Sequence, residues 1–139
     1  MLHHVQTYLD RLKYALESGT AEIRFQSKRK VDENRNKKFT NRYTLNKLFP
    51  DEDEVDALRR ELTTLTIDEY IETVKDTRFP KKSEMRVFGK VYSSEDVYIK
   101  IRVELINIKE LNGNGLIFIM SFHFAQVKFK ESDFPYKKI

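Results

Sequence analysis

Hydrophobic residues recur with a helical period in the N-terminal part of the chain and with a period of two in the C-terminal part. In residues 2–17 an apolar side chain falls every three or four positions, which predicts an amphipathic helix ended by Ser18-Gly19. A second apolar stripe follows the acidic block at 51–56, and acidic side chains favour the N-terminal end of a helix. The two stripes are Leu2, Val5, Leu9, Leu12 and Leu16, and then Val55, Leu58, Leu62 and Leu65.

Shorter elements are predicted around these helices. Residues 21–25 suit a short strand, and residues 45–49 suit a helical turn before a proline. The segment at 27–42 is polar, basic and without a period, which predicts an exposed loop. Thr66 suits an N-cap position, and Glu69 three residues later completes a capping box. The helix that this signal predicts carries Tyr70, Ile71 and Val74.

From residue 84 onwards the period of two predicts a sheet. Its three antiparallel strands are expected at 85–92, 97–108 and 115–128. Residues 93–96 join the first pair, and 110–115 join the second pair with two Asn-Gly steps, which favour hairpins. Helices followed by a meander predict an α+β fold, with the N-terminal helices packed on one face of a C-terminal antiparallel sheet.

The composition excludes several classes of protein. A length of 139 residues with 40% hydrophobic side chains suits one domain, spanning 1–139, around one core. The chain has no cysteine, which excludes a disulfide framework, a thiolate zinc site and a thiol nucleophile. No apolar run approaches the roughly 18 residues that span a bilayer, and the first residues lack the layout of a signal peptide. We therefore expect a cytoplasmic protein without a membrane partner.

The charge is unevenly distributed along the chain. The formal net charge is only +4, but basic residues cluster between residues 24 and 42, where only Asp32 and Glu33 offset them. The acidic block at 51–56 follows this basic cluster along the chain and has the opposite charge. Such a distribution favours a polyanionic ligand. A charged surface that contacts only solvent is the alternative.

Candidate chemical groups gather on the predicted sheet. In the strand predicted from residue 97, apolar and polar side chains alternate strictly, so that Tyr98, Lys100 and Arg102 share one face. In the last strand Ser121 and His123 share a face, and in a meander the two faces can align. The first strand offers Arg86 and Lys90 on one of its faces. His123 is either a catalytic residue or a structural histidine with its hydrogen bonds satisfied.

These residue types match the needs of RNA cleavage without a metal. A base removes the proton of the 2′-hydroxyl, cations stabilise the phosphoryl oxygens, and an acid protonates the departing 5′-oxygen. Histidine can serve as base or acid near neutrality, and arginine can hold a phosphate with two donors. Asp68 and Glu72 share a face of the helix predicted there, but no histidine or cysteine is spaced to join them. No phosphate-cradling glycine loop is present either. We therefore expect no metal and no cofactor.

Five segments in order resemble the MqsR-type toxins of bacterial type II toxin–antitoxin systems. They are 65–70 (LTIDEY), 85–90 (MRVFGK), 95–101 (EDVYIKI), 119–123 (IMSFH) and 134–137 (FPYK). The resemblance implies a RelE-like fold and an mRNA interferase, that is, an endoribonuclease that cleaves mRNA without a metal and arrests growth. It also implies a cognate antitoxin protein that neutralises the chain.

The resemblance also implies the site residues. The implied catalytic residues are His123, Tyr98, Lys100, Arg86, Tyr136 and Lys137. The basic residues expected to bind RNA are Arg29, Lys30, Lys37, Lys38 and Arg102. The alternative function is a non-catalytic RelE-like module that binds RNA or a protein, for example in a phage or mobile element.

Overall fold

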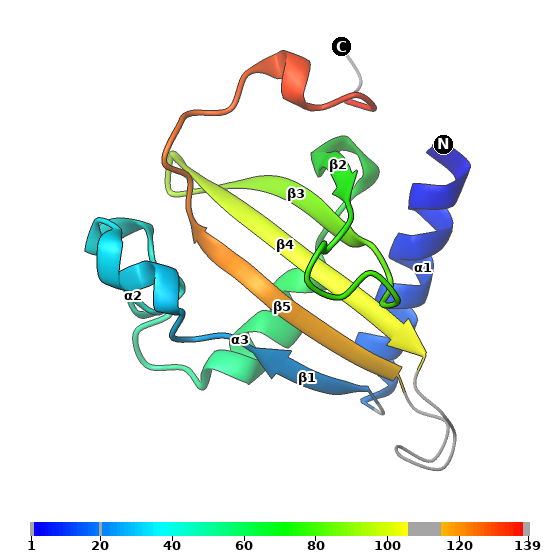
Figure 1. The fold of residues 1–139 in the computed structure, drawn as a ribbon, viewed down its shortest axis with the longest axis horizontal. Coiled ribbons are helices and arrows are strands. Elements are labelled where there is room, and N and C mark those ends of the chain that lie inside the picture. The colour runs from blue at the N-terminus through cyan, green and yellow to red at the C-terminus, as the bar shows by residue number, and fades with distance from the viewer. Residues whose placement is uncertain (1, 20, 106–114, 138–139) are drawn as a thin grey trace.

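The computed structural model describes residues 2–19, 21–105 and 115–137, which form three α-helices and a five-stranded sheet (Figure 1). The helices are α1 (Leu2–Ser18), α2 (Asn41–Leu48) and α3 (Glu54–Leu62). The strands are β1 (Glu22–Phe25), β2 (Tyr70–Val74), β3 (Met85–Tyr92), β4 (Glu95–Leu105) and β5 (Gly115–Phe124). Short 3-10 turns occur at Lys30–Asn34, Lys37–Phe39, Ile67–Glu69 and Glu131–Asp133.

The sheet is mixed, in the order β1-β5-β4-β3-β2. β3, β4 and β5 pair antiparallel, as the period of two predicts. β2 adds a further antiparallel strand that was not predicted, whereas β1 lies parallel to β5. The expectation of a purely antiparallel sheet is therefore wrong at this edge. The α+β class and the helices on one sheet face are confirmed, because α1 and α3 both lie behind the sheet in Figure 1.

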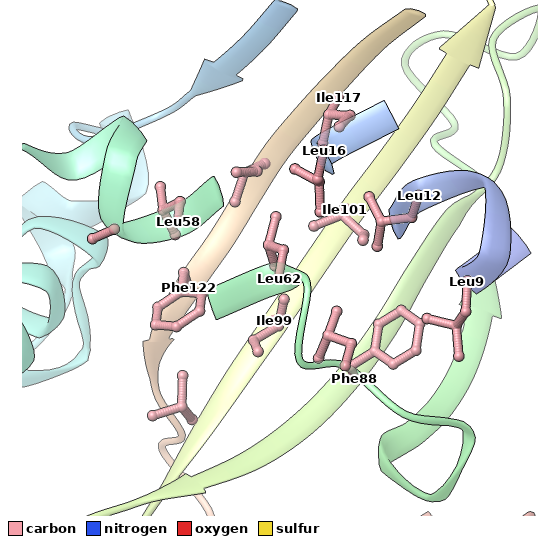
Figure 2. Packing of buried hydrophobic residues seen from close by; sticks show 14 of the residues in the cluster. Leu9, Leu12, Leu16, Leu58, Leu62, Phe88, Ile99, Ile101, Ile117 and Phe122 are labelled. Atoms are coloured by element: carbon pink, nitrogen blue, oxygen red, sulfur yellow. The ribbon is translucent and has the colours of Figure 1, made fainter. Parts of the chain in front are cut away.

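The hydrophobic core lies between these two helices and the sheet (Figure 2). The helices contribute Leu9, Leu12, Leu16, Leu58 and Leu62, and the strands contribute Phe88, Ile99, Ile101, Ile117 and Phe122, all at most 2% exposed. Each such side chain stabilises the fold by about 1.5–3 kcal/mol through its burial. Both apolar stripes predicted from the helical period therefore face the sheet, except that Leu2 at the start of α1 is exposed and Val55 is only partly buried.

A β-bulge in β5 decides which residues of this strand face the helices. Ile101 pairs with Ile119 and Lys100 with Ser121, so that Met120 is an extra residue in the ladder. Strict alternation would put Ile119 and Ser121 on the same face. The bulge instead keeps Ile119 in the core and turns Ser121 to the opposite face.

The segment after residue 66 differs from the prediction. Glu69 does accept a hydrogen bond from the Thr66 backbone N–H at 2.9 Å, as a capping box requires. The helix lasts only for the 3-10 turn, however, and Tyr70–Val74 forms β2. Pairing with β3 and the β-branched side chains at 71, 73 and 74 favour the strand over the helix that the capping signal predicts.

The strand ends also differ from the predicted bounds, except for β3, which has the predicted range. β4 starts at Glu95 because Ser93 and Ser94 form the turn, both with positive φ (51° and 68°), as a tight hairpin requires. β5 ends at Phe124, and the Ala125 N–H then bonds the Asp96 carbonyl at 2.9 Å. Residues 106–108, predicted as the end of the second strand, lie outside the described residues. So do residues 110–114 of the hairpin predicted at 110–115.

Side chains of α2 complete the outer edge of β5. β1 pairs with β5 only as far as Ile119, so the backbone groups beyond it need other partners. The Asn41 side chain donates to the Met120 carbonyl at 2.9 Å and accepts from the Phe122 N–H at 3.0 Å. Thr44 Oγ1 accepts from the Phe124 N–H at 2.9 Å. Asn41 and Thr44 are at most 1% exposed, so α2 acts here as a substitute for a neighbouring strand.

The chain after β5 first lies on the sheet face opposite the helices and then reaches the core at Tyr136, and it is held at several points. The Phe129 N–H donates to Asp96 Oδ2 at 2.9 Å. The Phe129 ring lies directly on Gly89, where a Cβ would come within 2.6 Å of it, so only glycine fits without a shift. Tyr136 stacks on Tyr70, with ring centroids 5.6 Å apart. In the described part of the chain, no helix has the length and apolar character needed to cross a membrane.

We expect Asn41→Ala to destabilise the fold by about 2–4 kcal/mol, because it leaves buried backbone groups of β5 without hydrogen bonds. Thr44→Val keeps the shape of the side chain and should cost about 1–3 kcal/mol for the same reason. Chemical unfolding monitored by circular dichroism measures both. Asn46→Ala, at an exposed position of the same helix, is the control and should change stability by less than about 0.5 kcal/mol. Equal stability of Asn41→Ala and the control would contradict this role for α2.

Candidate active site

A cavity of about 610 Å³ lies on the sheet face that the helices leave free. Its floor is formed by Tyr98 and Lys100 of β4 and by Ser121 and His123 of β5. In the ladder Tyr98 lies opposite His123, and Lys100 lies opposite Ser121. The alignment of the two strand faces expected from the sequence is therefore present. Its walls come from the 29–35 segment, from Glu72 of β2 and from the chain at 125–133.

His123 is held as a neutral ring with one defined tautomer. It is 7% exposed, and its Nδ1 lies 2.9 Å from the Phe124 carbonyl oxygen, which can only accept a hydrogen bond. Nδ1 therefore carries the proton, and the lone pair of the neutral ring is on Nε2. Burial lowers the pKa of His123, and the positive charges of Arg35 and Arg29 lower it further. Near neutrality His123 is thus suited to accept a proton.

The pKa values of Tyr98 and Lys100 are shifted in opposite directions. The Tyr98 ring stacks on His123 with centroids 5.4 Å apart. Burial raises the pKa of Tyr98, and the charge of Glu72 adds to the effect, so the phenol keeps its proton. Burial and then the charge of Arg29 lower the pKa of Lys100. Lys100 is therefore a stronger acid than an ordinary lysine, whereas Tyr98 is a weaker acid than an ordinary tyrosine.

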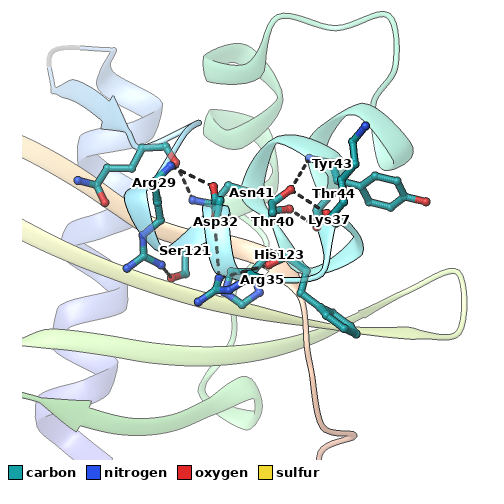
Figure 3. Close-up of polar contacts among 12 residues, drawn as sticks. Arg29, Asp32, Arg35, Lys37, Thr40, Asn41, Tyr43, Thr44, Ser121 and His123 are labelled. Atoms are coloured by element: carbon teal, nitrogen blue, oxygen red, sulfur yellow. Dashed lines mark hydrogen bonds and ion pairs between the residues drawn. The ribbon is translucent and has the colours of Figure 1, made fainter.

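Two arginines from the basic segment form one wall of the cavity (Figure 3). Arg29 Nη1 donates to Ser121 Oγ at 3.3 Å, and Arg35 Nη1 donates to the Phe39 carbonyl at 3.3 Å. Asp32 lies between them: its Oδ2 accepts from the Arg29 N–H at 3.0 Å, and its Oδ1 lies 4.0 Å from Arg35 Nη1. Burial lowers the pKa of Arg29, with a further effect from Arg35, yet a guanidinium stays charged near neutrality.

The prediction of an exposed loop at 27–42 is therefore wrong in part. The segment contains two 3-10 turns and the start of α2, and it places Arg29 and Arg35, which flank the first turn, against the cavity. Lys30, Lys37 and Lys38 are exposed as expected, and Lys38 forms an ion pair with Glu95 at 3.3 Å. Sequence reasoning missed Arg35 and Asp32, although the three-residue spacing of 29, 32 and 35 is a signal for one face of a 3-10 turn.

The structure does not bring Arg86 to the cavity. Arg86 lies opposite Ile101 in the ladder and shares its face with Phe88, so it points to the helix side of the sheet. Its guanidinium lies over the Tyr8 ring of α1, 4.6 Å from the centroid. Lys90 shares that face and pairs with Glu69 at 2.9 Å.

Three further predicted residues also lie outside the cavity lining. Arg102 is 5% exposed and forms ion pairs with Asp76 at 3.5 Å and Glu104 at 3.1 Å. Tyr136 packs against the core beside Tyr70, and Lys137 Nζ lies over the Phe134 ring, 5.6 Å from its centroid. Among the residues that the structure describes, no three His, Cys, Asp or Glu side chains cluster as metal ligands.

We expect Arg35→Gln to raise the pKa of His123, because it removes a positive charge that disfavours the imidazolium. Asp32→Asn should lower this pKa, because it removes the neighbouring negative charge. A pH titration of the imidazole C–H resonances by NMR measures both shifts. Lys47→Gln changes the net charge at an exposed position of α2 and should leave the titration unchanged. A titration of His123 that is the same in all four proteins would contradict the assigned electrostatics.

Comparison of the chain with protein-family models, with curated proteins and with solved structures finds no match.

Proposed function

We propose that the chain is a metal-independent endoribonuclease whose active site is the cavity at Tyr98, Lys100 and His123. The observation that carries the proposal is the neutral His123 ring, with its lone pair on Nε2, in a cavity lined by Lys100, Arg29 and Arg35. A base beside several cations is the combination that transesterification of a phosphodiester needs. A cavity of about 610 Å³ has room for a nucleotide.

The proposed mechanism uses His123 as the base. Nε2 accepts the proton of the 2′-hydroxyl, the 2′-oxygen bonds to phosphorus, and the bond from phosphorus to the 5′-oxygen breaks. The products are a 2′,3′-cyclic phosphate and a 5′-hydroxyl. Lys100 is the better proton donor to the departing 5′-oxygen, because its pKa is lowered while that of Tyr98 is raised. Tyr98 then acts as a hydrogen-bond donor, and Arg29 and Arg35 stabilise the charge on the phosphoryl oxygens.

The biological role that we propose follows the motif resemblance to MqsR-type toxins. The chain is then the toxin of a type II toxin–antitoxin system, with a RelE-like fold, single-stranded mRNA as substrate and a cognate antitoxin as partner. Two of the resembling segments, 95–101 and 119–123, include Tyr98, Lys100 and His123 of the cavity floor. The requirement for a 2′-hydroxyl excludes DNA as a substrate.

A non-catalytic RNA-binding module is the second candidate, favoured by the low exposure of His123. The ring is 7% exposed, stacked on Tyr98 and hydrogen-bonded to a carbonyl, which also suits a structural histidine. The same cationic cavity would then bind RNA in a salt-sensitive way without cleaving it.

His123→Ala tests the proposal against this alternative. We expect the wild-type chain, expressed without its partner, to arrest growth of a bacterial host and to create new 5′-hydroxyl ends in its RNA. His123→Ala should lower cleavage by about 10²–10⁴-fold, the usual contribution of a general base. His123→Gln is a second variant that retains a polar side chain of similar size, and circular dichroism checks the fold of both. His3→Ala with His4→Ala is the matched control and should cleave normally.

The possible outcomes separate the candidates. New ends with the wild type and with folded His123→Ala alike would remove His123 from the mechanism and leave Lys100 and Tyr98 as the reactive groups. No new ends with folded wild type, together with salt-sensitive RNA binding, would favour the binding module.

The pH dependence of cleavage gives an independent test. A base must be unprotonated, so the rate should rise with pH through the pKa of His123, and it should fall again at higher pH where Lys100 loses the proton that it donates. Because this pKa is lowered, the rise should be complete at a lower pH than for a histidine of ordinary pKa 6.5. Arg35→Gln should move the rise to higher pH, in step with the pKa that NMR measures. A rise at the same pH in wild type and Arg35→Gln would contradict His123 as the base.

A further inference from the structure

Arg86 has an unsatisfied buried donor on the helix side of the sheet. Its Nε is buried and has no hydrogen-bond partner in the part of the chain that the structure describes. Within the described residues Arg86 also forms no ion pair with a carboxylate. A buried donor without a partner destabilises the folded state, and a donor on a charged group does so more than a neutral one. Such a group in a native fold requires an explanation.

A second cavity of about 590 Å³ lies beside this guanidinium. It is lined by Arg86 and Tyr8, by Val103, and by Lys75, Pro80, Lys82, Ser83 and Glu84 of the segment between β2 and β3. Its three cationic side chains outnumber its one carboxylate. It shares no lining residue with the cavity at His123. Its properties therefore do not depend on the proposed catalytic site.

The geometry around Arg86 suits a small oxyanion. The Tyr8 ring lies under the guanidinium at 4.6 Å and fixes its plane through a cation–π contact. Nε–H and the adjacent Nη–H of an arginine form a fork that matches two oxygens of one phosphate. Burial raises the pKa of Tyr8, so its hydroxyl stays neutral beside the anion. Lys82 and Lys75 add positive charge, and Ser83 adds a hydroxyl that can donate.

We propose that this second cavity is a phosphate-binding site, with Arg86 as its anchor. The ligand is the phosphate of a nucleotide or of a nucleic-acid strand. A bound phosphate accepts from the unsatisfied Nε–H and offsets the positive charge of the lining. The site is separate from RNA cleavage, so it stands whether or not the chain is a nuclease.

The experiment follows the Arg86 Nε–H resonance by NMR while inorganic phosphate is added at constant ionic strength with chloride. We expect a saturable shift of this resonance. Arg86→Lys keeps the charge but loses the fork, and we expect phosphate to bind about tenfold more weakly, as followed by neighbouring amide resonances. Lys82→Gln should weaken binding several-fold, and Glu84→Gln should strengthen it. Lys47→Gln, far along the sequence on α2, is the matched charge control.

Two further arms identify the source of the phosphate and separate the two cavities. Adenosine 5′-monophosphate presents a terminal phosphate, whereas a short DNA strand without terminal phosphates presents only backbone phosphodiesters and has no 2′-hydroxyl to attack. Tighter binding of one of the two assigns the source. Lys100→Gln alters the first cavity and should leave phosphate binding at Arg86 unchanged.

Three results would overturn the proposal. The first is a shift of the Nε–H resonance that does not saturate. The second is equal phosphate affinity in wild type, Arg86→Lys and Lys82→Gln. The third is an equal loss of affinity in Lys82→Gln and Lys47→Gln, because this pattern indicates only general charge attraction.

Discussion

The hydrogen bonds between α2 and the outer edge of β5 position both halves of the candidate site. β5 continues beyond the end of β1, and buried backbone groups without partners would be costly there. Asn41 and Thr44 provide these partners, and so they fix the part of β5 that carries Ser121 and His123. The same docking holds the segment just before α2 against the sheet, which places Arg29 and Arg35 at the cavity. The floor and one wall thus depend on two side chains of a short helix.

Much of the fold could be predicted from local patterns. The alternation in β3 and β4 and the apolar stripes of α1 and α3 each contain enough residues to identify the element. The prediction of a helix at Tyr70–Val74 was wrong. The capping signal at Thr66 is present but determines only the 3-10 turn, and pairing with β3 determines the structure beyond it. The parallel pairing of β1 has no local signal at all. The bulge at Met120 was also missed, since Ile117-to-Met120 is apolar on both faces.

The candidate site was predictable only where strand register determines it. Tyr98, Lys100 and His123 share a face because two regular strands pair in a hairpin. For β3 alternation alone could not tell which face meets the core, since Phe88 lies on one face and Met85 and Val87 on the other. Arg86 therefore faces the helices instead of the cavity. The wall at Arg29 depends on a contact with Ser121, 92 positions away, in a segment without a period. Such a contact cannot be predicted from the local sequence pattern.

The 92 positions between Arg29 and Ser121 determine when the candidate site can form during translation. Chains emerge from the ribosome N-terminal end first, and contacts between distant positions form late because a long loop must close. Arg29 leaves the ribosome well before Ser121 and His123 exist, and the edge of β5 that α2 covers is also missing until then. A nascent chain that stops before residue 121 therefore lacks the whole β5 half of the cavity floor. The cavity is assembled only after most of the chain has been translated, so a chain that is shorter than this cannot form the candidate site.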